Sequence, residues 1–281
     1  MTQVVRGLGE EIAVRSVMDD KARSTRHCVR NKGQGASVAG NDDMRLSSRI
    51  ARLSTALTAF LAAITGIDGV AWAITGGIAC SDPNGLRRHV VRIVASDGMV
   101  CSGTIVGPRK IVTAAHCFPT TDAGRYRIMV LDHNFAEHWV AVSSIRVHPK
   151  FDRQGLDRQT QLNDIAVVNA AASLPGDMAI APIGGRAAQG EVTAVGFGTG
   201  YRGHDLRQVE LQARSAALSP TGSQILTSID GGACSGDSGG PVFRKSGKGF
   251  VLVGVISWTQ GSCGSMTAVT PVGPYRGFIG G

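Results

Sequence analysis

The chain has 281 residues, of which 43% are hydrophobic and 18% charged, so it holds enough apolar material for a folded core and is not a disordered chain. Glycine is abundant at 38 residues, aromatic residues make up only 5%, and no long heptad pattern occurs, which excludes a coiled coil or fibrous repeat and favours a turn-rich β protein. The formal net charge of +8 comes from basic residues spread along the chain rather than gathered in runs, so we expect no nucleic-acid partner.

The N-terminal part of the chain has two sections of different character. Residues 1–43 are polar and lack a sustained apolar period, so we interpret them as disordered, and either an over-extended translation start or a dispensable leader. Three arginines follow the internal Met44, an apolar stretch covers Ser54–Val70, and Ala71–Ala73 supplies an A-x-A pattern. This order is typical of a secretory signal peptide, which we place at residues 44–73.

A signal anchor that stays in the membrane is the competing interpretation of this segment, because the apolar stretch is near the lower limit for spanning a bilayer. Asp68 near its end and the A-x-A pattern favour cleavage. Cleavage after Ala73 leaves Ile74 as the new N-terminus of a mature domain, residues 74–281.

From residue 89 onward the chain consists of short segments rich in valine and isoleucine, separated by Gly, Pro, Asn or Asp. The predicted strands are His89–Ala95, Val100–Val106, Lys110–Ala114, Tyr126–Leu131, Trp139–Val147, Ile165–Asn169, Glu191–Gly196, Gln208–Ala216, Gln224–Ile229, Pro241–Phe243, Phe250–Ser257 and Thr267–Pro271. Many strands without intervening helical patterns indicate antiparallel barrels or sandwiches. We predict an all-β fold of two packed six-stranded antiparallel β-barrels, with a short helical end around Pro274–Ile279.

The stretch Gly236–Pro241 reads Gly-Asp-Ser-Gly-Gly-Pro and is the strongest candidate for chemistry. Glycines let a backbone turn approach a substrate closely and point several N–H groups into one small space, where a developing oxyanion can be held. A glycine-rich hairpin turn is the simpler interpretation of these six residues taken alone. The test is whether a base and an orienting acid occur elsewhere.

Two further segments supply those groups. His116 lies in Thr113–Cys117, directly after a predicted strand, although a lone histidine is more often a surface or core residue than a base. Asp164 opens an apolar strand, where burial is costly for a carboxylate unless it is paired. With Ser238 these residues give the chain order His, Asp, Ser that one class of catalytic triad uses.

Taken together, these segments resemble the chymotrypsin-like serine proteases of the trypsin family. The matching segments lie in the family's order across essentially all of residues 74–281, and they are Ile74–Gly77, Thr113–Cys117, Asp164–Val167, Gly236–Pro241 and Val255–Trp258. The resemblance implies a secreted serine endopeptidase that works without a cofactor and without a metal. Its partners are protein or peptide substrates, and we expect a monomer.

The resemblance assigns a role to each matching position. Ser238 attacks the scissile carbonyl, His116 takes the serine proton and passes it to the leaving amine, and Asp164 holds the imidazole. The backbone N–H groups of Gly236 and Ser238 form the oxyanion hole. Ser257 and Trp258 match the strand that lies beside the substrate backbone.

The resemblance also explains the acid inside the hexapeptide. In this family the amino group of a newly exposed isoleucine pairs with the acid that precedes the nucleophile, which here makes Ile74 and Asp237 an activation pair. Because signal cleavage after Ala73 itself creates that terminus, we expect a protease without a separate propeptide that becomes active on export.

The cysteines match family disulfides and suit an oxidising compartment. Cys101 with Cys117 and Cys234 with Cys263 are the pairs that the resemblance implies, and no Cys-x-x-Cys occurs, so we expect no metal site. Cys80 lacks its usual family partner, because valine stands at that position, Val192. A buried thiol is favoured over an intermolecular link.

The specificity pocket departs from the trypsin pattern. Gly232 falls at the floor, where a trypsin has an aspartate that pairs with arginine or lysine, so cleavage after basic residues is disfavoured. Thr259 and Thr267 fall at two wall positions that are glycine in trypsins. A narrowed neutral pocket predicts small or medium apolar side chains at the cleavage site.

Two other functions stay open from the sequence. A catalytically inactive relative that acts as a secreted binding protein usually lacks a triad member, whereas all three are present here. An uncleaved signal anchor gives a membrane-anchored envelope protease. With cleavage, the chain meets the membrane only transiently and is extracellular or periplasmic.

Overall fold

The computed structural model describes residues 74–82, 85–155, 163–185, 187–199, 206–213, 222–259, 263–264 and 266–281. The predicted leader, residues 1–43, and the predicted signal peptide, residues 44–73, lie outside these described residues. Among the helices of the described ranges, none combines the length and the apolar character that a membrane crossing requires.

The first half of the described chain forms a closed antiparallel barrel. Its strands are β2 (Val90–Ala95), β3 (Val100–Ile105), β4 (Lys110–Thr113), β5 (Tyr126–Leu131), β6 (Glu137–Val147) and β7 (Ala166–Ala170). The neighbour order is β2-β3-β4-β7-β6-β5, and the pairing of Ile93 with Ile128 joins β2 to β5 and closes the ring. These strands are rich in valine and isoleucine, and most of their side chains are buried in the barrel core or against neighbouring elements.

Strand β6 serves two neighbours because it bends. Its residues up to Ala141 pair with β5, and those from Val142 onward pair with β7. The pairing register shifts between Val142 and Ser144, which marks a β-bulge. A bulge increases local twist and lets one long strand turn a barrel corner.

The second half forms a seven-stranded sheet. Its strands are β1 (Ile78–Ala79), β8 (Gly190–Gly196), β9 (Arg207–Ala213), β10 (Gln224–Leu226), β11 (Pro241–Ser246), β12 (Gly249–Thr259) and β13 (Thr267–Pro271), in the order β1-β9-β8-β11-β12-β13-β10. This differs from the expected six-stranded barrel. The short β1 adds an edge strand beside β9. Within the described residues, β9 approaches the β10 end of the sheet through Gln212 and Thr227, which exchange two backbone hydrogen bonds of 2.8 and 3.1 Å.

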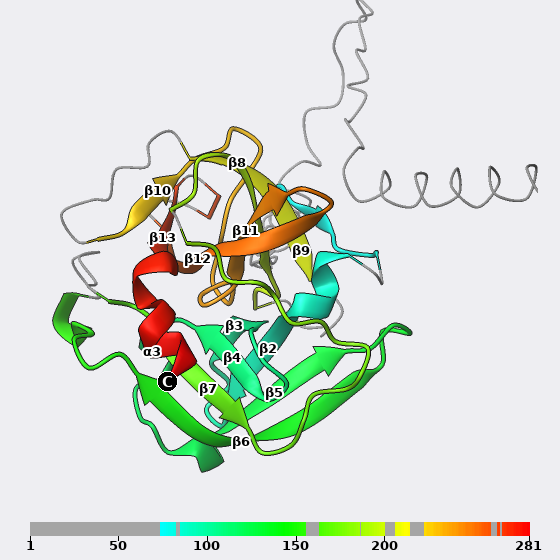
Figure 1. Cartoon of the computed structure of the whole chain (residues 1–281), viewed down its shortest axis with the longest axis vertical. Coiled ribbons are helices and arrows are strands. Elements are labelled where there is room, and N and C mark those ends of the chain that lie inside the picture. Colours follow the sequence, from blue (N-terminus) through cyan, green and yellow to red (C-terminus); the bar gives the residue numbers. More distant parts are fainter. Residues whose placement is uncertain are drawn as a thin grey trace, which may run out of the picture. The chain divides into compact units, whose positions relative to one another are not determined.

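Short helical turns connect the strands. They are η1 (Leu86–His89), η2 (Ala115–Cys117), η3 (Ala123–Arg125), η4 (Arg153–Gly155) and η5 (Gly273–Tyr275), followed by α3 (Arg276–Gly280) at the C-terminus. The predicted helical end is therefore present. It returns to the first barrel (Figure 1). There Lys110 Nζ donates to the Ile279 and Gly280 carbonyl oxygens at 3.2 and 3.1 Å. A lysine at this place stabilises the negative end of the helix.

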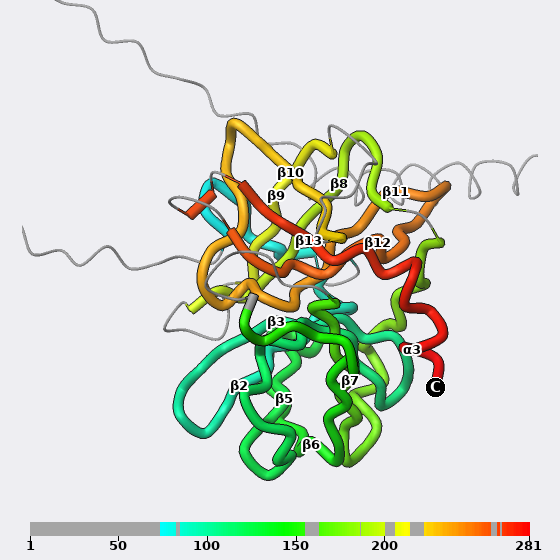
Figure 2. Tube along the Cα trace, turned by 90° about the vertical axis from the view of Figure 1, so that its left-hand side faces the viewer, coloured from blue at the N-terminus to red at the C-terminus, as the bar shows by residue number. Residues whose placement is uncertain are grey.

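The two sheets form the two lobes of the described unit, β2–β7 in one and β8–β13 in the other (Figure 2). The larger of two clusters of buried hydrophobic side chains fills the first barrel and extends to β8, β11 and β12 of the second sheet, and the smaller cluster lies within the second lobe. Each predicted strand overlaps an observed one, and the strand predicted at Pro241–Phe243 continues to Ser246 as β11. Residues 214–216 of the predicted strand Gln208–Ala216 lie outside the described residues. The main differences are β10, which ends at Leu226 rather than Ile229, and β1, which the sequence pattern did not indicate.

Candidate active site

His116 lies on the turn η2, immediately after β4, and a buried carboxylate holds it at two points. Its backbone N–H donates to Asp164 Oδ1 at 2.9 Å, and its ring Nδ1 lies 2.8 Å from Asp164 Oδ2. A carboxylate accepts but does not donate when ionised, so Nδ1 carries the ring proton. The other ring nitrogen, Nε2, is then free to accept a proton.

Asp164 precedes β7 and is completely buried. Burial alone raises the pKa of a carboxyl group, but the charge and hydrogen bonds of His116 and the hydrogen bond from Ser257 outweigh it, so the pKa of Asp164 lies below its ordinary value. Ser257, on β12, donates its hydroxyl to Asp164 Oδ2 at 2.5 Å. Behind this pair, the Tyr275 hydroxyl donates to Asn163 Oδ1 at 3.1 Å. The charged form of Asp164 is therefore stabilised from both lobes.

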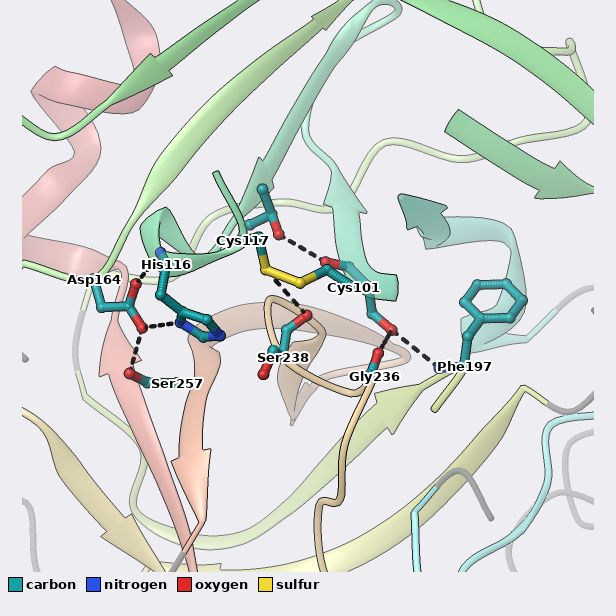
Figure 3. Close-up of a disulfide and its surroundings, with 10 residues drawn as sticks. Cys101, His116, Cys117, Asp164, Phe197, Gly236, Ser238 and Ser257 are labelled. Carbon is teal, nitrogen blue, oxygen red and sulfur yellow. Dashed lines mark hydrogen bonds and ion pairs between the residues drawn. A yellow bond between two sulfur atoms is a disulfide. The ribbon is translucent and has the colours of Figure 1, made fainter. Parts of the chain in front are cut away.

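Ser238 lies on the turn before β11, with the imidazole between it and Asp164 (Figure 3). The Ser238 carbonyl oxygen lies 3.9 Å from Cys117 Sγ, one residue from His116. Within the described residues, no hydrogen bond joins the Ser238 hydroxyl to the ring. Catalytic hydrogen bonds commonly tighten only when substrate binds. The structure thus brings together the three residues that the sequence predicted.

The turn around Ser238 is tight because glycines surround it. Gly236 has a φ of +85°, and a Cβ at this position would lie 2.2 Å from the Gly198 carbonyl carbon. Only glycine fits such a place without strain. Within the described part of the chain, neither the Gly236 nor the Ser238 N–H donates a hydrogen bond. Both N–H groups are thus available for the oxyanion that the sequence predicts them to bind.

Asp237 points away from Ser238 into a second buried site. Three backbone N–H groups donate to its carboxylate, from Ile74 at 2.9 Å, Cys234 at 2.8 Å and Gly198 at 2.9 Å. Burial nevertheless raises the pKa of Asp237 to about 7, although these three hydrogen bonds lower it. A Cβ on Gly196 would lie 2.2 Å from Asp237 Oδ1, which explains the glycine there. The predicted pair of Ile74 and Asp237 is in contact.

Ile74 itself is completely buried and has a φ of +33°, an unfavourable value for a β-branched residue. The next residue, Thr75, accepts a 3.0 Å hydrogen bond from the Gly232 N–H. The start of the described chain therefore contacts both the acid beside the nucleophile and the predicted floor of the specificity pocket.

The predicted pocket residues lie together. Thr259 and Thr267 are directly opposite each other on β12 and β13. The Thr267 hydroxyl oxygen lies 3.0 Å from the place where a Cβ on Gly232 would stand, and it accepts a 3.1 Å hydrogen bond from the Ala233 N–H. Trp258 and Thr259 are partly exposed on the same strand. The buried Thr267 therefore fills the space beside Gly232.

Both predicted disulfides are present. Cys101 is bonded to Cys117, and Cys234 to Cys263. The first joins β3 to the turn that carries His116. Cys80 takes part in neither and is 2% exposed within the core of the first barrel. That burial supports the interpretation of a buried thiol.

One group of three potential metal ligands occurs among the described residues, Cys101, His116 and Cys117, with ligand atoms within 4.8 Å of one another. Both sulfurs belong to the disulfide, and zinc-type sites use thiolates. The group therefore reflects the packing of the disulfide against the histidine turn.

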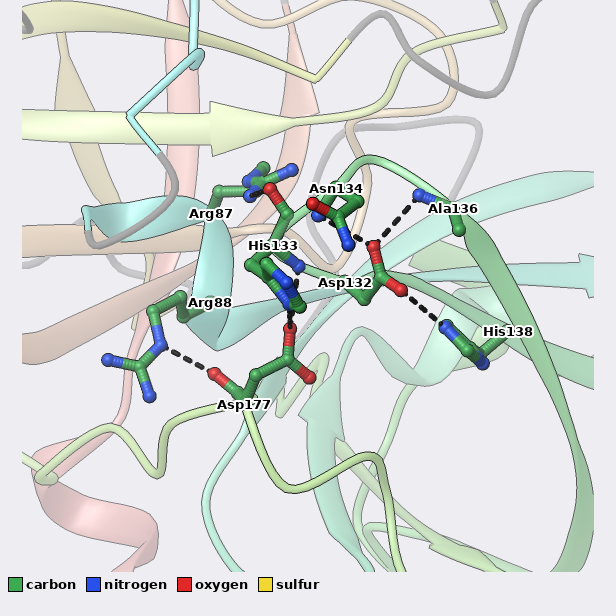
Figure 4. Close-up of polar contacts among 8 residues, drawn as sticks. All are labelled: Arg87, Arg88, Asp132, His133, Asn134, Ala136, His138 and Asp177. Carbon is green, nitrogen blue, oxygen red and sulfur yellow. Dashed lines mark hydrogen bonds and ion pairs between the residues drawn. The ribbon is translucent and has the colours of Figure 1, made fainter.

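A second polar cluster lies at the turn between β5 and β6 (Figure 4). Asp132 accepts hydrogen bonds from the His138 ring and from the N–H groups of Ala136 and Asn134, and these hold the pKa of Asp132 at about 2. Asp177 accepts a 2.6 Å hydrogen bond from the His133 N–H. Both carboxylate oxygens of Asp132 have protein donors, so the cluster stabilises the turn.

The sequence analysis missed four contributors to the site. They are Gly198, which donates to Asp237, the pair of Asn163 and Tyr275 behind the triad acid, and Ser102, whose hydroxyl donates to the Gly236 carbonyl at 3.0 Å. The Gly-Phe-Gly pattern at residues 196–198 and the position of Ser102 beside Cys101 were visible signals. Neither signal predicts which distant loop packs against these residues.

Comparison with known proteins identifies trypsins and other serine proteases as relatives. The profile of the trypsin family, described as Trypsin, matches residues 74–279. Trypsin, alkaline C of Manduca sexta is 34% identical over 188 residues, which are 57% of this chain and 69% of that protein. Trypsin alpha-4 of Lucilia cuprina is 32% identical over 217 residues, which are 67% of this chain and 78% of that protein.

A solved structure named human heparin binding protein has a TM-score of 0.60 and 21% sequence identity, covering 74% of this chain and 95% of that one. At this identity the similarity shows the fold, which is the chymotrypsin-like arrangement of a closed barrel beside a second, half-closed one. Together with the family match over residues 74–279 and the similarity to named trypsins, it establishes that the chain belongs to the trypsin family and is a serine endopeptidase.

Proposed function

We propose that residues 74–281 are the catalytic domain of a secreted endopeptidase in which Ser238, His116 and Asp164 form the triad. The observation that carries the proposal is the buried Asp164, which holds His116 through both its ring Nδ1 and its backbone N–H. This arrangement directs Nε2 toward the side on which Ser238 lies. A carboxylate with such partners stays ionised and stabilises the imidazolium that forms during catalysis.

In the proposed reaction, His116 Nε2 accepts the Ser238 proton and then donates it to the leaving amine. Ser238 Oγ bonds to the substrate carbonyl carbon while its proton moves to His116 Nε2, and the carbonyl oxygen becomes an oxyanion held by the N–H groups of Gly236 and Ser238. The C–N bond then breaks and the leaving amine takes the proton from Nε2. Water repeats the sequence on the acyl-enzyme, with His116 as base, and frees Ser238.

Activation follows from the same contacts. While Ile74 is joined to residue 73, it offers Asp237 a neutral N–H and holds an unfavourable φ. Cleavage after Ala73 converts that N–H into an ammonium group and removes the constraint on φ. The buried carboxylate then gains a cation, and the turn of Gly236 and Ser238 beside it is held in its active form. The enzyme is active once Ile74 is free.

A small neutral pocket sets the preference for substrate. Thr267 fills the space beside Gly232, and no acidic side chain stands at that floor position. We infer cleavage after small or medium apolar residues. A panel of Ala-Ala-Pro-Xaa 4-nitroanilides tests this, with fastest turnover expected for alanine or valine at Xaa. Fast turnover with arginine at Xaa contradicts it.

Export follows from the disulfides and the N-terminal segment. Disulfides persist in oxidising compartments, and the relatives include proteins named as a trypsin and a venom serine protease. We place the mature enzyme outside the cytoplasm, in the extracellular space or a periplasm.

A fluorophosphonate probe tests the nucleophile. The folded protein is expected to become labelled at Ser238, and Ser238→Ala to lose the label. Ser235→Ala is the matched control, because Ser235 is an exposed serine on the same turn and the label should remain. Absence of label in folded wild-type protein contradicts the triad and favours an inactive relative that acts as a binding protein.

N-terminal sequencing of the active protein tests export and activation together. The expected first residue is Ile74, in the soluble fraction. An active protein that starts upstream of Ile74 and stays with the membrane would instead be the anchored envelope protease.

A further inference from the structure

Ser102, on β3 of the first barrel, contacts the nucleophile turn of the second lobe at two points. Its backbone N–H donates to the Ser238 carbonyl oxygen at 2.8 Å, and its hydroxyl donates to the Gly236 carbonyl oxygen at 3.0 Å. The side chain is completely buried. One residue therefore holds the backbone carbonyls of both residues whose N–H groups we assign to the oxyanion hole.

The Ser102 hydroxyl is itself fixed in direction. The Phe197 N–H donates to Ser102 Oγ at 3.0 Å, so the hydroxyl hydrogen is left to point at Gly236 (Figure 3). The Thr113 hydroxyl donates to the Ser102 carbonyl at 2.7 Å and holds the backbone. Buried hydrogen-bonded chains of this kind are rigid because each unpaired member is costly.

Gly236 needs an external restraint more than other residues do. It has a φ of +85° and no Cβ, so its backbone can rotate with little steric cost. The peptide bond after Gly236 is held at its N–H end by a 3.2 Å hydrogen bond from Asp237 to the Cys234 carbonyl. The Ser102 hydroxyl holds the carbonyl end. The Gly236 N–H belongs to the preceding peptide, which shares the Gly236 Cα with this one. With both ends of the following peptide fixed, the Gly236 Cα is held in place, and the freedom of the N–H to change direction is reduced.

On the premise that Ser238 is the nucleophile, as proposed above, we propose that the Ser102 hydroxyl is a positioning group for catalysis. It preorganises the Gly236 N–H toward the oxyanion. Its neighbour Cys101 is tied by its disulfide to Cys117, beside His116. Two adjacent residues of β3 thus hold the base on one side and the oxyanion-binding turn on the other.

The test compares the steady-state kinetics of Ser102→Ala with those of the wild type on an Ala-Ala-Pro-Ala 4-nitroanilide. The substitution keeps both backbone hydrogen bonds of residue 102 and removes only the hydroxyl. We expect kcat to fall on the order of tenfold or more, since a lost oxyanion donor costs about 100-fold to 1000-fold and here the donor is only released from its restraint. KM should change less than about threefold, because the restraint acts on a group that binds the transition state. Affinity for a peptide boronic acid, which places an oxygen in the oxyanion site, should fall in parallel with kcat.

Thr104→Val is the matched control, because Thr104 is also completely buried on β3 and its hydroxyl makes no hydrogen bond within the described structure. It should keep wild-type kcat and boronic-acid affinity. A Ser102→Ala enzyme with wild-type kcat and boronic-acid affinity overturns the positioning role. A change in KM and thermal stability alone, with kcat retained, also overturns it in favour of a purely structural role.

If Ser102→Ala does not fold, a pair of variants with side chains of the same shape tests the proposal instead. Ser102→Thr and Ser102→Val have the same shape and differ in the hydroxyl, so the threonine enzyme should have the higher kcat. Equal kcat in the two overturns the proposal. Failure of the triad itself gives a different result, namely a folded wild-type protein that neither turns over substrate nor takes a fluorophosphonate label.

Discussion

At the scale of single residues, two completely buried aspartates have opposite electrostatic environments. Asp164 faces an imidazole that becomes cationic, and the pKa of Asp164 lies below its ordinary value despite burial. Among the described residues, the groups that donate to Asp237 are neutral backbone N–H groups, and burial raises the pKa of Asp237 to about 7. A buried carboxylate without a cation is a costly group. That cost is what the amino group of Ile74 is proposed to relieve.

Replacing Asp164 by asparagine tests the first environment. The amide cannot select the Nδ1–H tautomer of His116 or stabilise its cation, so kcat should fall on the order of 10⁴-fold, as when the corresponding acid is replaced in serine proteases of this family. The measurement is steady-state hydrolysis of an apolar 4-nitroanilide. Asp97→Asn, at an exposed surface aspartate, should leave kcat unchanged. A loss of less than tenfold in Asp164→Asn contradicts the assigned role.

Two forms that differ by one residue test the second environment. In a form that starts at Ala73, the pKa of Asp237 is about 7 in the folded protein and has its ordinary value of 3.8 in the unfolded chain, so the folded state binds the proton more tightly. Its free energy of unfolding should fall by up to about 4 kcal/mol as pH rises from about 4 to about 7, and then level off. For the form that starts at Ile74, the free energy of unfolding should fall less over the same pH range, because the terminal ammonium group favours the charged carboxylate of Asp237.

Urea denaturation at several pH values measures this difference. In the Ala73 form, Asp237→Asn removes the titrating carboxyl group, so the free energy of unfolding should depend less on pH. The Ala73 form should also have the lower kcat. The same pH slope in both forms would show that the terminal amino group does not reach Asp237.

At the scale of elements, the strand pattern was predictable and its closure was not. Short segments rich in valine and isoleucine, separated by turn residues, placed every strand of the first barrel, because β-branched residues favour strands and Gly, Pro, Asn or Asp end them. The edge strand β1 has two residues, too few for such a pattern. The bulge in β6 between Val142 and Ser144 was not predictable either, because one extra residue leaves no recognisable pattern in the sequence.

The facing strands β12 and β13 make a prediction about specificity. Thr267→Gly removes the side chain that fills the space beside Gly232, so the pocket should deepen and kcat/KM for phenylalanine or leucine at the cleavage site should rise relative to alanine, by about tenfold to 100-fold for the added contact. Thr270→Gly is the control, since it weakens the same strand from its opposite face. Unchanged relative rates across an Ala-Ala-Pro-Xaa panel would mean that Thr267 does not limit the pocket.

The disulfide between β3 and η2 makes a prediction about stability. Replacing Cys101 and Cys117 together by alanine opens a loop with a sequence separation of 16, which should lower the free energy of unfolding by about 3 kcal/mol. Activity should fall as well, because the turn carrying His116 is less fixed. Cys80→Ala leaves both disulfides intact and should cost on the order of 1 kcal/mol. Similar losses in the two variants would argue against a special role for this disulfide.

At the scale of the whole molecule, the proposed catalytic mechanism depends on how the two lobes meet. His116 and Asp164 belong to the first barrel, whereas Ser238 and Ser257 belong to the second sheet. Hydrogen bonds of Ser102 and Ser257 cross between the lobes at the reacting groups themselves. A shift of either lobe therefore changes the distance between base and nucleophile.

The N-terminal segment is the other whole-molecule question. A chain that starts at Met44 should be exported, begin at Ile74 and have the same specific activity as the full-length chain, because we interpret residues 1–43 as dispensable. N-terminal sequencing and a 4-nitroanilide assay of the exported protein measure both. Ala73→Glu in the same chain should block the cut and leave the protein with the membrane. Loss of export on removing residues 1–43 would assign them a function.

The sequence by itself determined the family resemblance, most strand positions and the order of His116, Asp164 and Ser238, because each depends on a local pattern or on short motifs with little freedom. The resemblance in turn implied both disulfide pairs. Only the tertiary structure decided which groups meet across the lobes. The Ser102 hydroxyl at Gly236, Thr267 beside Gly232 and the extra edge strand β1 all arise from contacts between residues far apart in the chain. Such contacts depend on packing and backbone direction, which no local spacing encodes.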